Sequence, residues 1–299
     1  MSDLTLEALL KAGAHFGHQT KRWNPKMKPY ILTQRSGIHL INLKETLDNI
    51  NRADEIIIQN VLNKQPILFV GTKKQARVVV KEQAEQCGVF YVTERWLGGM
   101  LTNFGTIRRS VETLENIELM EEDGTMASLT KKEAGKLRKK KEKLANVLGG
   151  VRDMKRLPGV VIIVDTKKEH IVVSEARKLK IPIIAIVDTN CDPDEVDCPI
   201  PANDDAIKSI EIIIMSLANT IKQANEKEKI KQEEEKNKKR EQEEKNDAEI
   251  KVKKVVKKKE VEKVSGTEVK GTPETKERPK KKVVKKRVIK KEDAQEEKK

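Results

Sequence analysis

Short, almost entirely apolar runs alternate along this chain with stretches of helical periodicity. Four of the runs have the length of buried strands: PILFVG (66–71), GVFYV (88–92), GVVIIVD (159–165) and IPIIAIVD (181–188). A strand that is apolar on both sides has to be covered on both faces of its sheet. Segments with helical spacing accompany these runs, at about 44–62, 73–86, 168–179 and 203–223. The alternation predicts an α/β fold, a Rossmann-like parallel sheet with flanking helices.

The residues before the first of these strands predict a smaller unit. A capped helix is expected at about 4–13, and a β-hairpin at 30–34 and 38–43 that turns around Ser36-Gly37. Between them lies a stretch rich in glycine, histidine, proline and lysine, residues 13–29.

Two long helical patterns interrupt the alternation at about 105–150. Each carries only a narrow apolar seam, formed by Ile107, Val111, Leu114 and Ile117 and then by Leu137, Leu144 and Leu148. A polar turn at Asp123-Gly124 separates the two patterns. They predict a protruding, antiparallel helical coiled hairpin; two ordinary packed helices are the alternative.

The composition changes near residue 225. Residues 226–299 hold 28 basic and 19 acidic residues and no aromatic one. Such a segment cannot bury enough apolar surface to offset the entropy of ordering it. We therefore expect an α/β domain at 1–225 and a disordered Lys/Glu-rich C-terminal tail at 226–299, with a helical extension to about 247. A purely solvated tail and a weak RNA contact both remain open.

The charge of the chain favours a polyanionic partner. Lysine and arginine number 62 against 48 acidic residues, a formal net charge of +14. Three scattered cysteines do not form a disulfide framework. The N-terminus lacks the pattern of a secretory signal, and the apolar runs are too short to span a membrane. We expect a cytoplasmic protein without a membrane partner.

A basic stretch before the hairpin is the first candidate for nucleic-acid binding. Its cations Lys21, Arg22, Lys26 and Lys28 stand close to Trp23 and to two prolines. A stiff loop of this kind offers cations to phosphates and a ring to a base or sugar. The alternative is a surface loop whose tryptophan fills the core.

GTKKQA (71–76) follows an expected strand and opens an expected helix. That geometry offers backbone N–H groups and a lysine, Lys73 or Lys74, to a phosphate. The motif lacks the glycines of a Walker loop and of the dinucleotide fingerprint. RNA phosphate contact, a plain strand-to-helix turn and a mononucleotide site all remain open.

A third candidate region starts at Arg95 and leads into the first helix of the insertion. Arg108 and Arg109 lie in the first turns of that helix, where cations oppose the helix dipole. We expect this pair to bind an external anion; two solvated surface arginines are the alternative.

A nucleotide- or metal-dependent α/β enzyme is the second interpretation of the chain. Asp165 and Asp188 each end an expected strand, where open α/β sheets place their ligands. An enzyme of this class would use them with Lys73, and a divalent ion would add His15 or His18. Capping of turns by the aspartates, and hydrogen bonding of the histidines within their loop, are favoured. No nucleophile signature is recognisable.

Six segments together resemble the bacterial ribosomal protein family "S two", the second protein of the small subunit. They are AGAHFGHQTKRWNPKM (12–27), GIHLINL (37–43), LFVGTKKQA (68–76), RWLGGMLTNF (95–104), KLANVLGG (143–150) and IPIIAIVDTNCDPDEVDCPIPANDDA (181–206). Their order and spacing carry the resemblance, which covers roughly residues 2–224. The C-terminal extension departs from the family, since most members lack it or keep it short.

The resemblance implies a Rossmann-like domain with a protruding helical hairpin, bound to the ribosome between the head and body of the small subunit. It implies contacts with small-subunit ribosomal RNA and with ribosomal proteins, including the large OB-repeat protein that gathers messenger RNA. It implies no catalysis. We expect no cofactor, no metal and no homo-oligomer, although a metal ion at His15 or His18 remains open. Carried over by motif, the expected RNA-binding residues are Lys21, Arg22, Trp23, Lys26, Lys28, Lys73, Lys74, Arg95, Arg108 and Arg109.

Overall fold

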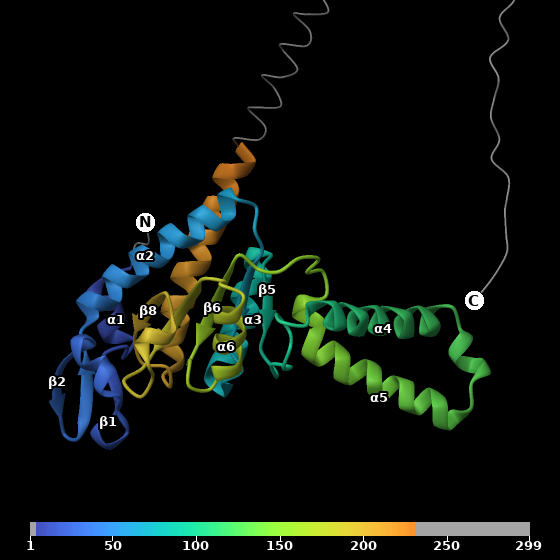
Figure 1. The fold of residues 1–299 in the computed structure, drawn as a ribbon, viewed down its shortest axis with the longest axis horizontal. Coiled ribbons are helices and arrows are strands. Elements are labelled where there is room, and N and C mark those ends of the chain that lie inside the picture. The colour runs from blue at the N-terminus through green and yellow to red at the C-terminus, as the bar shows by residue number, and fades with distance from the viewer. Residues whose placement is uncertain (1–3, 231–299) are drawn as a thin grey trace, which may run out of the picture. The chain divides into compact units, whose positions relative to one another are not determined.

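A computed structural model describes residues 4–230 of the chain (Figure 1). Nearly all of the expected tail, including the helical extension toward 247, lies outside the described residues. No helix within residues 4–230 is both long and apolar enough to cross a membrane.

Five parallel strands form the central sheet. Along the chain they are β4 (Ile67–Val70), β5 (Phe90–Val92), β6 (Val160–Val164), β7 (Ile183–Val187) and β8 (Cys198–Pro201). Their order in the sheet is β5-β4-β6-β7-β8, and every neighbouring pair is parallel. The predicted parallel sheet is confirmed. The sequence did not reveal β8, because prolines at 199 and 201 argue against a strand; at the edge of a sheet they are tolerated.

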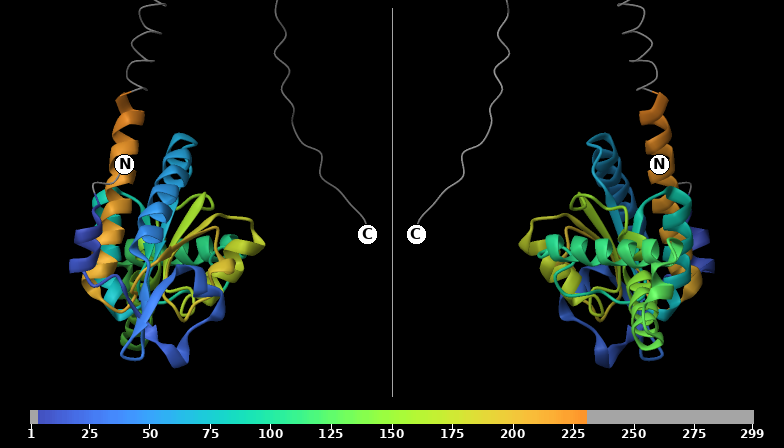
Figure 2. Two further views of the ribbon diagram at one scale, coloured as in Figure 1. Left: turned by 90° about the vertical axis from the view of Figure 1, so that its left-hand side faces the viewer. Right: turned by 90° about the vertical axis from the view of Figure 1, so that its right-hand side faces the viewer.

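Helices cover both faces of this sheet. On one face lie α2 (Leu43–Leu62), α3 (Lys74–Cys87) and a closing helix over residues 207–230. On the other lie α6 (His170–Lys178) and the base of the helical insertion. Figure 2 shows α2 and the closing helix on the same side of the sheet. Alternate strand residues point to opposite faces, so each strand contributes to both cores.

The N-terminal part forms a second, antiparallel sheet. After α1 (Leu6–Lys11), the strands β1 (Phe16–Gln19), β2 (Ile31–Arg35) and β3 (Ile38–Ile41) pair in the order β1-β3-β2. Strands β2 and β3 confirm the predicted hairpin. β1 was not predicted, because FGHQ has only one apolar side chain. Two short 3₁₀ helices, η1 (Thr20–Arg22) and η2 (Pro25–Tyr30), connect β1 to β2.

The insertion forms two helices that pack against each other, α4 (Phe104–Glu122) and α5 (Lys131–Leu148). Figure 1 shows them running side by side, away from the sheet. The predicted seam of α4 is buried, and Thr130 begins α5 with a capping box. Ion pairs from Lys141 and Arg138 to Glu121 join the helices along their exposed sides. The structure thus contains the predicted helical hairpin.

Two adjacent glycines at the root of the hairpin give a sharp test of this packing. A β-carbon at position 150 would lie 2.2 Å from the backbone oxygen of Tyr91, whereas one at position 149 would meet nothing within 4 Å. Backbone at such a contact has to move, at a cost of about 1–3 kcal/mol. We expect Gly150→Ala to lower the Tm measured by circular dichroism, and Gly149→Ala to leave it nearly unchanged. Equal Tm values for the two variants would contradict this packing.

Candidate nucleic-acid interface

The basic stretch between β1 and β2 is docked onto the carboxyl end of β7. The backbone N–H of His18 donates to the Asp188 carboxylate (3.1 Å) and to the Thr189 hydroxyl (2.9 Å). Further along, the N–H of Asn24 donates to the carbonyl of Thr189 (2.7 Å). A β-carbon on Gly17 would lie 2.6 Å from the Thr189 side chain, so this approach requires glycine. The stretch is therefore a fixed part of the sheet's carboxyl edge.

Its four cations divide into two kinds. Lys21, Arg22 and Lys28 are exposed, and their side chains make no hydrogen bond or ion pair within residues 4–230. Lys26 instead contacts the carboxylates of Asp192 (2.7 Å) and Asp194 (3.0 Å). Its hydrogen bond to Asp192 raises the pKa of the Lys26 ammonium. Lys26 fastens the stretch to the loop after β7, while the other three are free for an external anion.

Trp23 is half-buried and packs on the ring of His39, with ring centroids 5.0 Å apart and planes tilted by 39°. The core-filling alternative is thus partly met, and the contact of Trp23 with RNA stays a prediction. One side of the indole serves the small antiparallel sheet.

The two lysines after β4 point into different surroundings. Lys74 is exposed at the start of α3, with no side-chain partner among the described residues. The side chain of Lys73 is only 13% exposed, and its ammonium lies 2.7 Å from Asp204, 2.6 Å from Asp205 and 3.5 Å from Asp165. Burial would lower the pKa of Lys73, but the hydrogen bonds to Asp204 and Asp205 outweigh it and raise the pKa above its usual value. Its charge is neutralised inside the protein, which disfavours a phosphate there.

The arginines of the third candidate region also separate. Arg95 follows β5, and Arg109 lies in α4. Both are exposed, and neither side chain has a partner in the described part of the chain. Arg108 donates to the backbone carbonyls of Arg152 (2.7 Å) and Met154 (3.4 Å). Arg108 therefore ties the start of α4 to the segment after α5, and only Arg109 of this pair faces outward.

A buried glutamate organises the segment after Arg95. The Glu175 carboxylate, on α6, accepts hydrogen bonds from the backbone N–H groups of Gly99 (2.7 Å), Leu101 (3.0 Å) and Thr102 (3.0 Å). It also accepts from the Trp96 indole (3.2 Å). Burial alone would raise the pKa of Glu175, but these hydrogen bonds lower it below its usual value. Sequence reasoning missed this residue, because a lone glutamate in an amphipathic helix looks solvent-exposed.

Sequence reasoning also missed the cation Lys167. It follows β6 as Lys74 follows β4, and it is exposed with no side-chain partner in residues 4–230. Its neighbour Lys168 donates to the carbonyl of Thr72 (3.0 Å). The signal was present in the sequence as a lysine pair directly after a buried strand.

The unpaired cations gather because the strands are parallel. Residues that follow β4, β5 and β6 all emerge at the carboxyl edge of the sheet, and the basic stretch is docked at the end of β7 on that edge. We call this set the cationic edge: Lys21, Arg22, Lys28, Lys74, Arg95 and Lys167. Open α/β sheets bind their ligands at this edge.

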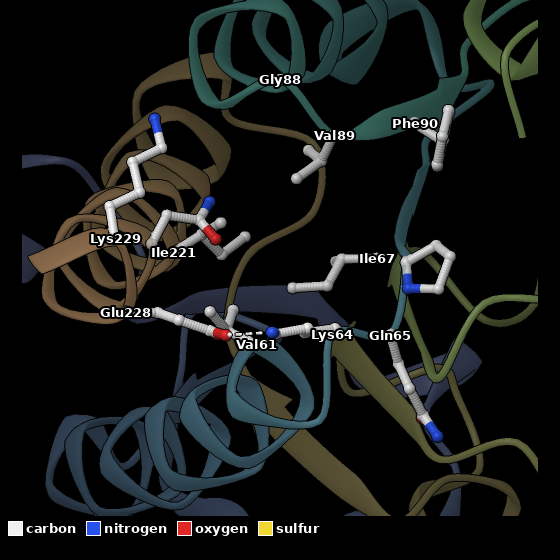
Figure 3. Close-up of a pocket in the computed structure, with 12 residues that line it drawn as sticks. Val61, Lys64, Gln65, Ile67, Gly88, Val89, Phe90, Ile221, Glu228 and Lys229 are labelled. Carbon is white, nitrogen blue, oxygen red and sulfur yellow. Dashed lines mark ion pairs between the residues drawn. The ribbon is translucent and has the colours of Figure 1, made fainter. Parts of the chain in front are cut away.

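A well-formed pocket of the described residues lies elsewhere. Its volume is about 410 Å³, and it opens at the amino ends of β4 and β5 (Figure 3). Val61, Ile67 and Ile221 supply apolar walls, and an ion pair joins Lys64 to Glu228 (3.5 Å). None of the predicted RNA-binding residues lines it. A smaller cavity of about 300 Å³ lies at the opposite edge, with Thr72, Arg77 and Arg95 in its walls.

Fold and surface together define an α/β protein that presents unpaired cations at the ligand edge of its sheet. A protein-family model described as "Ribosomal protein S2" matches residues 9–224, most of the chain. The chain therefore belongs to the ribosomal protein S2 family and is a small-subunit ribosomal protein. That family is one of structural constituents of the ribosome acting in translation, and it is not an enzyme family.

Proposed function

We propose that this protein binds small-subunit ribosomal RNA through its cationic edge, as a ribosome-bound constituent in the cytoplasm. The observation that carries the proposal is the separation of its cations. Lys26, Lys73 and Arg108 are held by protein oxygens, whereas the six residues of the cationic edge have no internal partner among the described residues. A cation without a protein partner is available to neutralise a phosphate.

The residues that hold the edge in place support the same function. Glu175 fixes the segment after Arg95, and Lys26 with Asp192 and Asp194 fixes the basic stretch. Cations on fixed loops lose less conformational freedom on binding than cations on flexible ones. Of the predicted RNA-binding residues we retain Lys21, Arg22, Lys28, Lys74, Arg95 and Arg109 as direct phosphate contacts, with Trp23 as a neighbour of the first group. Lys26, Lys73 and Arg108 act as positioning residues.

A nucleotide-dependent enzyme is the less favoured candidate. Its phosphate would have to approach Lys73, whose ammonium contacts three carboxylates. An anion that approached Lys73 would be repelled by these carboxylates.

The proposal also includes contacts with neighbouring ribosomal proteins, among them the large OB-repeat protein. These contacts rest on membership of the family.

Ultraviolet cross-linking of assembled small subunits, followed by peptide mass spectrometry, tests where the RNA lies. We expect nucleotide adducts on peptides that contain residues 16–30 and 93–109. Adducts confined to peptides from helix α2 or from the closing helix would contradict the proposed interface. Adducts on residues 231–299 in addition would show that the tail also contacts RNA.

A further inference from the structure

A small pocket lies where the strand order of the central sheet reverses. The chain passes from β4 to β5 on one side of β4 and then crosses back to β6 on its other side. Open α/β sheets bind ligands at the carboxyl ends of the strands beside such a reversal. The cavity of about 300 Å³ occupies this position, because Thr72 follows β4, Arg95 follows β5 and Glu169 follows β6. Its volume suits one small ligand.

A buried carboxylate with one free oxygen lines this pocket. Glu169 is only 4% exposed. Its Oε1 accepts hydrogen bonds from the backbone N–H of Thr72 (3.0 Å) and from the Thr72 hydroxyl. Its Oε2 makes no hydrogen bond or ion pair within residues 4–230. Burial raises the pKa of Glu169, because the Thr72 donors offset only part of the lost hydration. A ligand that donates an N–H to Oε2 would remove this cost.

The Arg77 guanidinium gives the pocket a fixed, flat group. Its Nε donates to the carbonyl of Thr72 (3.0 Å). Its Nη1 and Nη2 donate to the carboxylate (2.9 Å) and to the carbonyl (3.1 Å) of Glu94. All three nitrogen atoms have acceptors, so the plane is held in one orientation. Nucleobases stack on guanidinium planes, and Trp96 adds apolar surface to the same pocket.

Two further cations of the pocket remain able to bind an anion. Arg95 is exposed and has no side-chain partner in the described residues. Lys168 donates one N–H to the carbonyl of Thr72 (3.0 Å), which leaves two for a ligand. Glu94 is paired with Arg77, so these two cations face only the carboxylate of Glu169. A fitting ligand therefore combines an N–H donor with a negative charge, which disfavours a lysine of a partner protein.

We propose that this pocket binds one unpaired nucleotide of RNA whose base carries an exocyclic amino group. The amino group donates to Oε2 of Glu169, the base stacks on Arg77, and the phosphates lie against Arg95 and Lys168. Adenine, cytosine and guanine carry such a group and uracil does not, so the pocket selects against uracil. The inference rests on the proposed RNA binding and adds base selection to it, since phosphate contacts alone carry no sequence information. A free mononucleotide has the same chemistry, and the experiment separates the two sources.

Cytosine against uracil is the sharpest comparison, because these bases are equal in size and differ mainly at the amino group. The full-length chain with Trp23→Phe keeps Trp96 as its only tryptophan, so its emission reports on the pocket. This protein is titrated with single-stranded oligocytidylate and oligouridylate of equal length. Oligocytidylate should change the Trp96 emission and bind about 10–100-fold more tightly, the worth of a hydrogen bond to a charged group. Competition between the two on the unsubstituted chain gives the same comparison.

Variants assign the roles within the pocket. In Glu169→Gln the amide oxygen stays with the Thr72 donors and an N–H₂ group replaces the free acceptor, so the preference for oligocytidylate should vanish or reverse. The matched control is Glu82→Gln, an exposed glutamate of α3 without a side-chain partner in residues 4–230, which should keep the wild-type preference. Arg95→Gln should weaken the binding of both oligonucleotides and lower the salt slope by nearly one unit, with the preference intact.

Equal affinities of the wild type for the two oligonucleotides would overturn the proposal, and so would a preference that survives in Glu169→Gln. Cytidine monophosphate that binds as tightly as oligocytidylate would overturn the assignment to RNA. These results leave the proposed function standing, because its failure appears instead as missing adducts on residues 16–30 and 93–109. The wild-type comparison decides the question should Glu169→Gln fail to fold.

Discussion

Replacing Glu175 with alanine is expected to destabilise this protein more than any other single change proposed for it. The substitution leaves the N–H groups of Gly99, Leu101 and Thr102 and the Trp96 indole without their acceptor; those of Leu101 and Trp96 are buried. Each orphaned donor costs about 1–3 kcal/mol, so we expect a loss of roughly 3 kcal/mol or more in the free energy of unfolding. Urea denaturation followed by circular dichroism measures it.

Two comparisons make the Glu175 prediction specific. Glu82→Ala removes an exposed glutamate of α3 that has no side-chain partner in residues 4–230, and it should change stability by less than about 0.5 kcal/mol.

The stability that Glu175 contributes should also depend on pH. The folded-state pKa of Glu175 lies below its usual value, so its contribution to the free energy of unfolding is complete above the unfolded-state pKa. That contribution is lost as the pH falls through the folded-state pKa. The difference in the free energy of unfolding between the wild type and Glu175→Ala should therefore shrink in acid. A difference that stays constant across the acidic range would contradict the assigned hydrogen-bond network.

The second large effect is expected from the basic stretch. A triple variant, Lys21→Gln with Arg22→Gln and Lys28→Gln, removes three unpaired cations of the cationic edge. Each lost phosphate contact lowers the slope of log affinity against log salt by nearly one unit. We expect the slope of log affinity against log salt to be shallower by about 2–3 units in the variant. The variant should also bind small-subunit ribosomal RNA more weakly than the wild type at low and moderate salt. Filter binding of the full-length protein over a salt series measures both quantities.

A charge-matched control separates this effect from net charge. Lys64→Gln with Lys227→Gln and Lys229→Gln removes three cations from the end of α2 and from the closing helix, by the pocket at the amino ends of β4 and β5. Its salt slope should stay close to that of the wild type. If both triple variants lose the same slope, RNA binding depends on total charge, and the proposed edge is not its site.

The strands and helices of the central domain were largely predictable. A strand that is buried on both faces appears in the sequence as an apolar run, and an amphipathic helix appears as apolar residues that recur with the helical period. Strand β8 was not, since Pro199 and Pro201 argue against a strand and only the edge position tolerates them. Strand β1 was not, since its burial pattern is irregular. Whether β1 and β8 form strands depends on the strands they pair with, β3 and β7, and the local sequence does not show that pairing.

The candidate site was predictable in its residue types but not in their roles. Lys73 and Lys74 are adjacent and chemically identical, yet only Lys73 meets Asp204, 131 residues further along the chain. Likewise Lys26 meets Asp192 and Arg108 meets the carbonyl of Arg152. Such pairs depend on strand order, which brings distant loops to one edge of the sheet. The expected disorder of the tail lies outside the described residues and stays a prediction.

Stoichiometric binding to ribosomal subunits tests the central claim most directly. Small subunits depleted of their S2 protein are incubated with the full-length chain and sedimented over a salt series, with a peptide of scrambled 226–299 sequence as the control. We predict one copy per subunit, retained at moderate salt that removes the peptide, and earlier loss of the Lys21, Arg22 and Lys28 triple variant. Sedimentation no greater than that of the scrambled peptide, at any salt concentration, would contradict a specific ribosomal role for the α/β domain.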